Sequence, residues 1–223
     1  MKTEIIYEDT DIIVCHKPAG LATQTNQLGQ VDVVSELKNH IGKQQTNTNP
    51  YIGLVHRLDQ PVEGILVVGK NPGATKNLSN QLTQDKMEKR YYALLEKIPE
   101  PSEDVLKDYL LKDGRTNLSK VVEAGTKEGK YAQLSYKTIQ DNLVEIRLKT
   151  GRHHQIRVQM AAHGMSLLGD SKYGSKNCLE QSAKEGIRNV ALCAYYFTFV
   201  HPKTGKKMEF SICPKNLPCD YFM

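Results

Sequence analysis

The alternation of hydrophobic and polar positions divides the 223-residue chain into many short strand-like runs and a few helical ones. Alternation is clearest where Val144, Ile146 and Leu148 are interleaved with charged residues, so one face of that strand is expected to be buried and one wet. Further β-type runs occur at 5–7, 12–15, 90–95, 105–111, 119–122, 132–139, 191–200 and 206–212. The pattern predicts a strand-rich protein built largely from hairpins.

Helical spacing of apolar residues is confined to four segments. Helices are predicted over 31–41, from Pro72 onward, over 152–163 and, more weakly, over 179–190. Asn71 followed by Pro72 is the clearest start signal, because Asn caps helices and Pro suits the first helical position. The fold class expected is α+β, a single domain over 1–223 with a mixed, largely antiparallel sheet flanked by helices.

Composition places the chain among soluble globular proteins, with 39% hydrophobic and 25% charged residues. No apolar run is long enough to span a membrane, and the N-terminus is too acidic and too short in apolar residues for a signal peptide. We therefore expect a cytoplasmic protein without a membrane partner. The net charge of +5 agrees with a polyanionic partner without singling one out.

The cysteines argue against disulfides and against zinc. There are five, an odd number, and no two form a C-x-x-C pair: Cys15, Cys178, Cys193, Cys213 and Cys219. Without an export signal they are expected to be reduced and mostly buried thiols. No metal site is predicted, because ligand pairs at short spacing are missing.

The run over 54–68 places polar residues between two strand-like segments. Pro61 and Gly64 mark a turn, so Asp59 is expected at a strand-to-turn junction beside a hydrophobic wall. A carboxylate there has two uses. It can cap backbone N–H groups of the turn, or it can act as a nucleophile or general base. This stretch alone leaves both open.

Arg157 is placed by helical periodicity on an apolar face, between Met160 and Ala161. A buried guanidinium needs an anion, and we nominate Asp59 as its bidentate carboxylate partner. The alternative is that the side chain of Arg157 reaches solvent over its own methylene groups.

Basic and aromatic residues begin the same predicted helix. Arg152, His153 and His154 stand at its N-terminus, where backbone N–H groups and the helix dipole favour an anion such as phosphate. The alternative is a solvated, polar helix start. Two adjacent histidines do not face one metal ion, so a metal site is rejected here.

Tyr91 and Tyr92 are adjacent on a predicted strand, so they point to opposite sides of the sheet. One is expected to pack in the core. The other is available to stack on a base or to cover the wall of a pocket.

Four segments carry motifs in a fixed order along nearly the whole chain. They are Tyr7-Glu8-Asp9 to Lys17-Pro18-Ala19-Gly20, His56-Arg57-Leu58-Asp59 with Gly64, Lys89-Arg90-Tyr91-Tyr92-Ala93-Leu94, and Thr150-Gly151-Arg152 through Arg157 to Gly169-Asp170 and Tyr173-Gly174. Together they resemble the pseudouridine synthases of the large-ribosomal-subunit type A group. One tetrapeptide is a weak sign, but four motifs in register are a strong one.

The resemblance implies isomerisation of uridine to pseudouridine in ribosomal or transfer RNA, without a metal or organic cofactor. It implies that Asp59 is the catalytic carboxylate, that Tyr91 lies beneath the target base, and that Arg157 pairs with Asp59. The target base is expected to flip out of its stack. The residues expected to contact RNA are His56, Arg57, Arg152, His154 and Gln155. For Arg57, a structural role is the alternative.

Several positions depart from the family pattern. Val62-Glu63 replaces the usual Thr-Ser, which adds negative charge near Asp59 and puts local RNA contacts in doubt. Gln159 and Cys193 stand where His is frequent. No room is left for a separate N-terminal RNA-binding domain, so the catalytic domain is expected to recognise a compact RNA stem-loop, without an obligatory protein partner.

Two other functions compete with RNA isomerisation. The first is a catalytically inactive relative that binds RNA, for which the Val62-Glu63 departure is the only sequence support. The second is a carboxylate-dependent hydrolase with His56 or His154 as the base and Asp59 as the acid or nucleophile. Isomerisation leaves the mass of the RNA unchanged, whereas hydrolysis releases a product.

Overall fold

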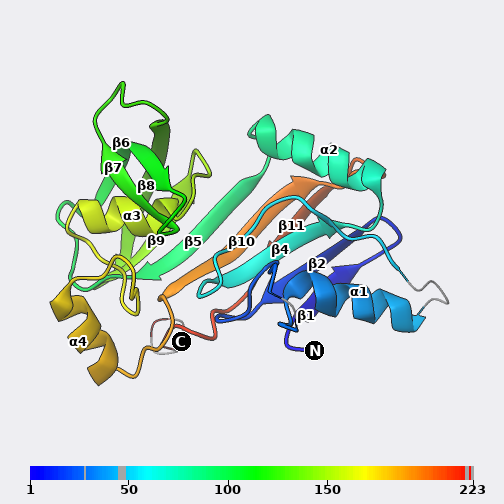
Figure 1. The fold of residues 1–223 in the computed structure, drawn as a ribbon, viewed down its shortest axis with the longest axis horizontal. Helices are drawn as coiled ribbons and strands as arrows, with labels where there is room; N and C mark the ends of the chain where they lie inside the picture. Colours follow the sequence, from blue (N-terminus) through cyan, green and yellow to red (C-terminus); the bar gives the residue numbers. More distant parts are fainter. Residues whose placement is uncertain (28, 45–48, 219–220, 222–223) are drawn as a thin grey trace. The chain divides into compact units, whose positions relative to one another are not determined.

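A computed structural model describes residues 1–27, 29–44, 49–218 and 221. The chain forms two compact units (Figure 1). Unit 1 consists of residues 1–89 and 194–215, and unit 2 consists of residues 90–193 and 216–223. That the two units behave as a single domain stays a prediction.

Unit 1 is built on a sheet with the strand order β1-β2-β4-β10, in which β3 also pairs with β4 and β11 with β10. Its strands are β1 (Glu4–Glu8), β2 (Ile12–Lys17), β3 (Gly53–Leu54), β4 (Glu63–Gly69), β10 (Leu192–Val200, in unit 1 from residue 194 on) and β11 (Lys207–Ser211). The pairings β1–β2, β2–β4, β3–β4 and β10–β11 are antiparallel. The opening and closing hairpins predicted from the sequence are therefore confirmed.

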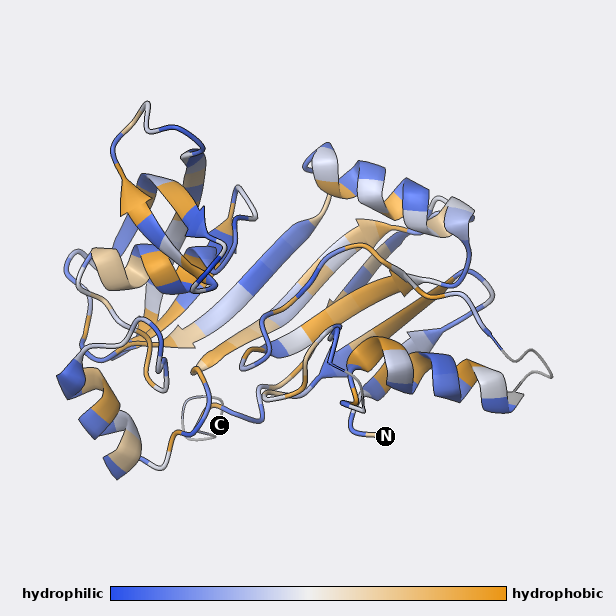
Figure 2. Ribbon diagram, in the orientation of Figure 1, coloured by the Kyte–Doolittle hydropathy of each residue, from blue (hydrophilic) through white to orange (hydrophobic). Residues whose placement is uncertain are grey.

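Two helices cover the sheet of unit 1, α1 (Val33–Gln44) and α2 (Pro72–Thr83). Asn71 caps α2 as predicted, because its Oδ1 accepts a hydrogen bond from the N–H of Ala74 at 2.8 Å. The core under α2 contains Ile12, Val14, Ile65, Val67, Leu78 and Phe197. Figure 2 shows the resulting hydrophobic run along β2 and β4. Both strands are buried over their whole length, so neither alternates.

Gly64 opens β4 in a conformation that side chains rarely adopt, with φ +146. A Cβ at this position would lie 2.5 Å from the Cβ of Ala194 on β10 and 2.6 and 2.7 Å from its backbone N and O. Glycine is therefore required here by conformation and by space.

Unit 2 contains an antiparallel sheet with the strand order β5-β9-β8-β6-β7. The strands are β5 (Glu88–Leu94, in unit 2 from residue 90 on), β6 (Glu103–Asp113), β7 (Leu118–Val122), β8 (Lys130–Gln140) and β9 (Leu143–Leu148). All four runs predicted over 105–148 are strands, and the turns between them lie where Gly, Asp and Asn cluster.

The helices of unit 2 begin and end at other residues than predicted. Helix α3 spans Gln155–Ala162, because His154 adopts a left-handed conformation, with φ 53, and interrupts the helix on its N-terminal side. Arg152, His153 and His154 therefore precede the helix instead of forming its first turn. Helix α4 spans Lys176–Lys184 and starts at the cap Ser175, and Gly186, with φ +71, follows its end instead of interrupting it.

The α+β class with a largely antiparallel sheet and flanking helices is confirmed. Within the described part of the chain, no helix is long and apolar enough to cross a membrane. Cys15, Cys178 and Cys193 are buried as expected, whereas Cys213 is exposed and Cys219 lies outside the described residues. The polar loop expected around 44–49 also lies mostly outside them.

Candidate active site

Asp59 stands at the first position of a tight turn in unit 1, but the expected strand-to-turn junction is not found there, because β3 already ends at Leu54. Its backbone carbonyl accepts a hydrogen bond from the N–H of Val62 at 3.0 Å, and its side chain is half-buried. His56 and Arg57 lie on the same loop, so the structure brings three of the nominated residues together in unit 1. The neighbours of Asp59 along the chain are fixed from both sides by the segment 17–23.

Thr23 fixes the residue before Asp59. Its hydroxyl donates to the carbonyl of Leu58 at 2.8 Å and accepts from the N–H of Leu58 at 3.2 Å. Gln60 is held in a similar way, because its carbonyl accepts from the N–H of Gly20 at 2.9 Å and its side-chain amide donates to the Gly20 carbonyl at 3.2 Å. The Asp59 backbone is therefore positioned by a network of hydrogen bonds to main-chain groups.

Lys17 is the centre of this network, and sequence analysis gave it no role. Its side chain is fully buried, and Nζ donates to the carbonyls of Pro18, Leu21 and Gln60 at 2.9, 2.7 and 3.1 Å. Burial lowers the pKa of Lys17 to about 8, while the charges of Asp59 and Glu63 act to raise it. The signals for this role in the sequence were the place of Lys17 at the end of a β-type run and within the first motif.

Glu63, which the sequence placed near Asp59 as an added negative charge, is buried in unit 1. Its side chain is 1% exposed, and Oε1 lies 2.7 Å from Nε2 of the buried His16. Both carboxylate oxygens also accept a hydrogen bond from the N–H of Lys215, at 3.0 and 3.1 Å. The departure from the family pattern at this position therefore places a buried carboxylate inside unit 1, bound to His16 and to the Lys215 backbone.

His56 is neutral at pH 7, since burial and then the charge of Lys89 keep its pKa well below the usual range. Its Nε2 accepts from the N–H of Val67 at 3.4 Å, which leaves the ring proton on Nδ1. Lys89 is half-buried, burial lowers its pKa to about 8, and Nζ lies 5.7 Å from the centre of the Phe197 ring. Arg57 is exposed and donates to Oε1 of Gln24 at 3.3 Å.

Tyr91 is the buried member of the tyrosine pair on β5. It is 6% exposed and pairs in register with Ile146 of β9, whereas Tyr92 is half-buried and points to the other face. The tyrosine that the resemblance nominates is therefore the one that faces the interior. Its place beneath a target base stays a prediction.

Arg157 is 3% exposed, so the alternative in which it reaches solvent is wrong. Its guanidinium forms a bidentate ion pair with Asp170, with Nε to Oδ2 and Nη2 to Oδ1 both at 2.7 Å. Asp170 also accepts from the backbone N–H groups of Lys172 and Tyr173. The sequence predicted a bidentate pair between Arg157 and Asp59. In the structure the bidentate partner of Arg157 is Asp170. Pairing of Arg157 with Asp59 stays a prediction.

A chain of aromatic contacts connects Arg157 to the residues before α3. The guanidinium carbon lies 5.2 Å from the ring centre of Tyr173, whose hydroxyl is 2.8 Å from Nδ1 of His154. His154 is buried and stacks on His153 with ring centres 3.8 Å apart. Arg152, His154 and Arg157 therefore belong to one rigid segment of unit 2.

Gln155 is buried, and the RNA contact expected of it stays a prediction. It is 3% exposed, and its Oε1 accepts from the Thr150 hydroxyl and from the N–H of Arg152 at 2.8 and 2.9 Å. Its Nε2 donates to the carbonyl of Gln133 at 3.1 Å. The amide shapes the turn before α3. Gln159, a second departure, is also buried and donates to Asp108 at 2.7 Å.

Comparison with known proteins decides the family. The family model described as RNA pseudouridylate synthase matches residues 11–162, more than half of the chain. The chain belongs to the RNA pseudouridylate synthase family. It is therefore an isomerase that converts uridine to pseudouridine in RNA. This chemistry does not favour the inactive relative or the hydrolase considered above.

Curated relatives of this synthase are similar over most of its length. It is 32% identical to ribosomal large subunit pseudouridine synthase D of Zymomonas mobilis subsp. mobilis over 217 residues, 93% of this chain and 68% of that protein. It is 30% identical to ribosomal large subunit pseudouridine synthase C of Haemophilus influenzae over 217 residues, 95% of this chain and 65% of that protein. The synthase thus spans about two thirds of these relatives.

Solved structures support the fold. Human RNA Pseudouridylate Synthase Domain Containing 1 superimposes with a TM-score of 0.77 at 20% identity, covering 97% of this chain and 85% of the other. Human RNA Pseudouridylate Synthase Domain Containing 4 gives a TM-score of 0.76 at 21% identity, covering 98% and 90%. The pseudouridine synthase fold expected from the sequence is confirmed.

Proposed function

We propose that this synthase modifies a uridine of large-subunit ribosomal RNA, with Asp59 as the catalytic carboxylate. The RNA class is supported by the names of the two curated relatives, which are ribosomal large subunit pseudouridine synthases. The carboxylate is supported by the rigid backbone around Asp59, which Lys17 and Thr23 hold on both sides. A fixed backbone is what a group that must meet a single reacting atom requires.

The reaction breaks the glycosidic bond between C1′ and N1, rotates the uracil, and joins C5 to C1′. Asp59 can serve this by attacking C1′ of the ribose or C6 of the base, or by deprotonating C2′. Tyr91 would hold the detached uracil by stacking, and its hydroxyl could accept the proton from C5. Arg157 would orient Asp59, with Asp170 in turn fixing Arg157.

RNA would be held by residues from two of the four motif segments. Arg57 is exposed and able to fill the space of a flipped base or to bind a phosphate. His56 presents its Nδ1 proton, and Arg152 is exposed ahead of α3. A contact through His154 would be limited to the small part of its ring that is not buried. The proposed location of such an enzyme is the cytoplasm.

The decisive experiment measures tritium release from RNA that carries 5-tritiated uridine. Transcripts of large-subunit ribosomal RNA and of transfer RNA would be compared with wild-type protein and with Asp59→Asn. We expect release from the ribosomal transcript with the wild type and loss of at least about a thousandfold with Asp59→Asn.

Asp85→Asn is the matched control, because Asp85 is an exposed turn residue of the same unit. It should release tritium at the wild-type rate. Release by Asp59→Asn at the wild-type rate would overturn the carboxylate assignment. Release from transfer RNA alone would overturn the RNA class.

A further inference from the structure

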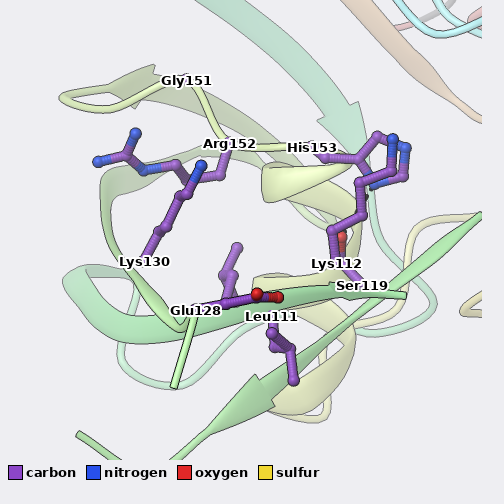
Figure 3. A pocket seen from close by; sticks show the side chains of 9 residues that line it. Leu111, Lys112, Ser119, Glu128, Lys130, Gly151, Arg152 and His153 are labelled. Atoms are coloured by element: carbon purple, nitrogen blue, oxygen red, sulfur yellow. Dashed lines mark hydrogen bonds between the residues drawn. The ribbon is translucent and has the colours of Figure 1, made fainter. Parts of the chain in front are cut away.

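Unit 2 contains a positively charged hollow of about 380 Å³ that the proposed chemistry does not use (Figure 3). It lies among β6, β7, the start of β8 and the segment before α3. Its lining residues are Leu110, Leu111, Lys112, Ser119, Glu128, Lys130, Gly151, Arg152 and His153. We call it the β6–β8 hollow. Three of these side chains are cationic and one is anionic.

The cations of the β6–β8 hollow are not neutralised by the protein. Within the part of the chain that the structure describes, neither Lys112, Lys130 nor Arg152 forms an ion pair with a carboxylate. In Figure 3 the Arg152 and Lys130 side chains lie together on one side of the hollow, and Lys112 and His153 lie on the other. The Glu128 carboxylate lies between the two sides and offsets one of the three positive charges, so the remaining positive charge is stabilised when an anion enters.

Two of the lining side chains are already held in place. Arg152 donates from Nε to the carbonyl of Tyr131 at 2.8 Å, which leaves its terminal nitrogens for a ligand. His153 lies 2.9 Å from the Ser119 hydroxyl through Nδ1 and 3.1 Å from Oδ1 of Asn117 through Nε2. A site with fixed donors loses less conformational entropy on binding than one built from mobile chains.

We propose that the β6–β8 hollow binds a backbone phosphate of the substrate RNA, apart from the target nucleotide. This inference rests on the proposed function, because it names a second point of attachment for the same RNA. Arg152 and Lys130 would bind the phosphate oxygens, Arg152 with its planar fork and Lys130 as a point charge. Lys112 would neutralise an adjacent phosphate across the hollow.

The hollow suits a polymer strand better than a free metabolite. Lys112, Lys130 and Arg152 are all exposed, so the strand can pass through without being enclosed. Glu128 also faces the hollow, and its charge opposes any anion. Three cations and one carboxylate give the hollow a net charge of about +2. This charge suits the phosphodiesters of an RNA strand, each of which carries one negative charge.

Fluorescence anisotropy with a labelled RNA hairpin tests the proposal directly. We expect Lys130→Gln and Arg152→Gln each to weaken binding about three- to tenfold, and to reduce the slope of log affinity against log salt by about 1. Glu128→Gln should tighten binding, because it removes the opposing charge. Lys107→Gln is the matched control, since Lys107 is exposed on β6 and does not line the hollow.

Two results would overturn the inference. One is unchanged affinity and salt slope for both Lys130→Gln and Arg152→Gln. The other is a loss equal to that of Lys107→Gln, which would indicate a general charge effect. Competition with uridine monophosphate distinguishes a small-molecule site. Displacement of the hairpin at low ligand concentration would contradict a strand-binding hollow, whereas resistance would support it.

Single-turnover tritium release separates this inference from the proposed function. At saturating ribosomal transcript, Lys130→Gln should approach the wild-type rate, because the phosphate contact contributes to binding and not to the chemical step. If the wild type releases no tritium, the proposed function fails while the binding comparison still stands. If the wild type releases tritium and the variants bind normally, only the hollow is refuted.

Discussion

The two units hold their nominated site residues in different ways. Unit 1 positions Asp59 through the main chain, since Lys17, Thr23 and Gly20 bind the carbonyls and N–H groups of the residues on either side of it. Unit 2 positions Arg157 through side chains, with a bidentate carboxylate on one edge and a tyrosine ring beside it. A single substitution is therefore expected to remove more of the support in unit 2.

The difference also separates two kinds of chemical group. A carboxylate on a turn can be aimed by fixing φ and ψ, because its side chain is short. A guanidinium sits at the end of a long side chain with several rotatable bonds, so it has to be held at its own atoms. Each unit uses the form of support that the reach of its side chain requires.

Asp170→Asn should have the largest effect. It removes the carboxylate that carries the Arg157 ion pair, and breaking a buried ion pair costs about 3–5 kcal/mol of unfolding free energy. Urea unfolding at pH 7 measures it. Asp141→Asn, at an exposed turn of the same unit, is the control and should change stability by less than about 0.5 kcal/mol. An Asp170→Asn protein as stable as the control would refute the inference that the Asp170 side chain holds Arg157 in place.

Lys17→Met should have a smaller effect of about 2–3 kcal/mol, because the carbonyls of Pro18, Leu21 and Gln60 lose the buried donor that they share. Urea unfolding gives the stability, and tritium release gives the consequence for the Asp59 turn. Lys43→Met, at an exposed position in the last turn of α1, removes the same charge. Equal results for the two variants would show that the carbonyl network does not hold the turn.

Lys89→Met tests a second lysine of unit 1. Carbonyl groups accept hydrogen bonds from Lys17, but no acceptor among the described residues binds the half-buried Lys89 ammonium group. At pH 7 the variant should be more stable by about 1 kcal/mol, since only a cation–π contact offsets the desolvation. The pKa of Lys89 in the folded protein is about 8, below its usual value of 10.5.

The pH dependence of that difference has a definite sign. Between pH 8 and 10.5 the unfolded chain binds the extra proton, so wild-type stability from this group rises with pH and is lost as pH falls through 8. The advantage of Lys89→Met should therefore shrink at pH 9. Lys86→Met, an exposed neighbour, should show no such trend. An advantage that grows with pH would contradict the assignment.

Much of the fold could be predicted from local patterns. The Asn71 cap, the hairpins and the strands of unit 2 follow from residue preferences that act within a few positions, and the structure agrees with them. The start of α3 could not be predicted this way. His154 takes a left-handed conformation because its ring packs between His153 and Tyr173, a contact 19 residues distant in sequence.

The candidate site was predicted less completely for the same reason. The burial of Arg157 followed from helical periodicity, but its partner Asp170 lies 13 residues away, beyond the end of the helix. Gln155 has a polar side chain in a motif position, which suggested an RNA contact, and Glu63 adds a charge near Asp59 that put such contacts in doubt. Both side chains are buried and accept hydrogen bonds from backbone N–H groups, and no periodicity reveals whether a polar side chain turns inward.

Gly64 limits how this enzyme can diverge. Any larger residue there would overlap the main chain of Ala194, not only its methyl group. Trimming residue 194 to glycine would still leave the peptide nitrogen and oxygen in the way, so no compensating exchange on β10 can rescue the variant. Descendants of this sequence are therefore expected to keep position 64 unchanged even as the neighbouring Val62 and Glu63 drift.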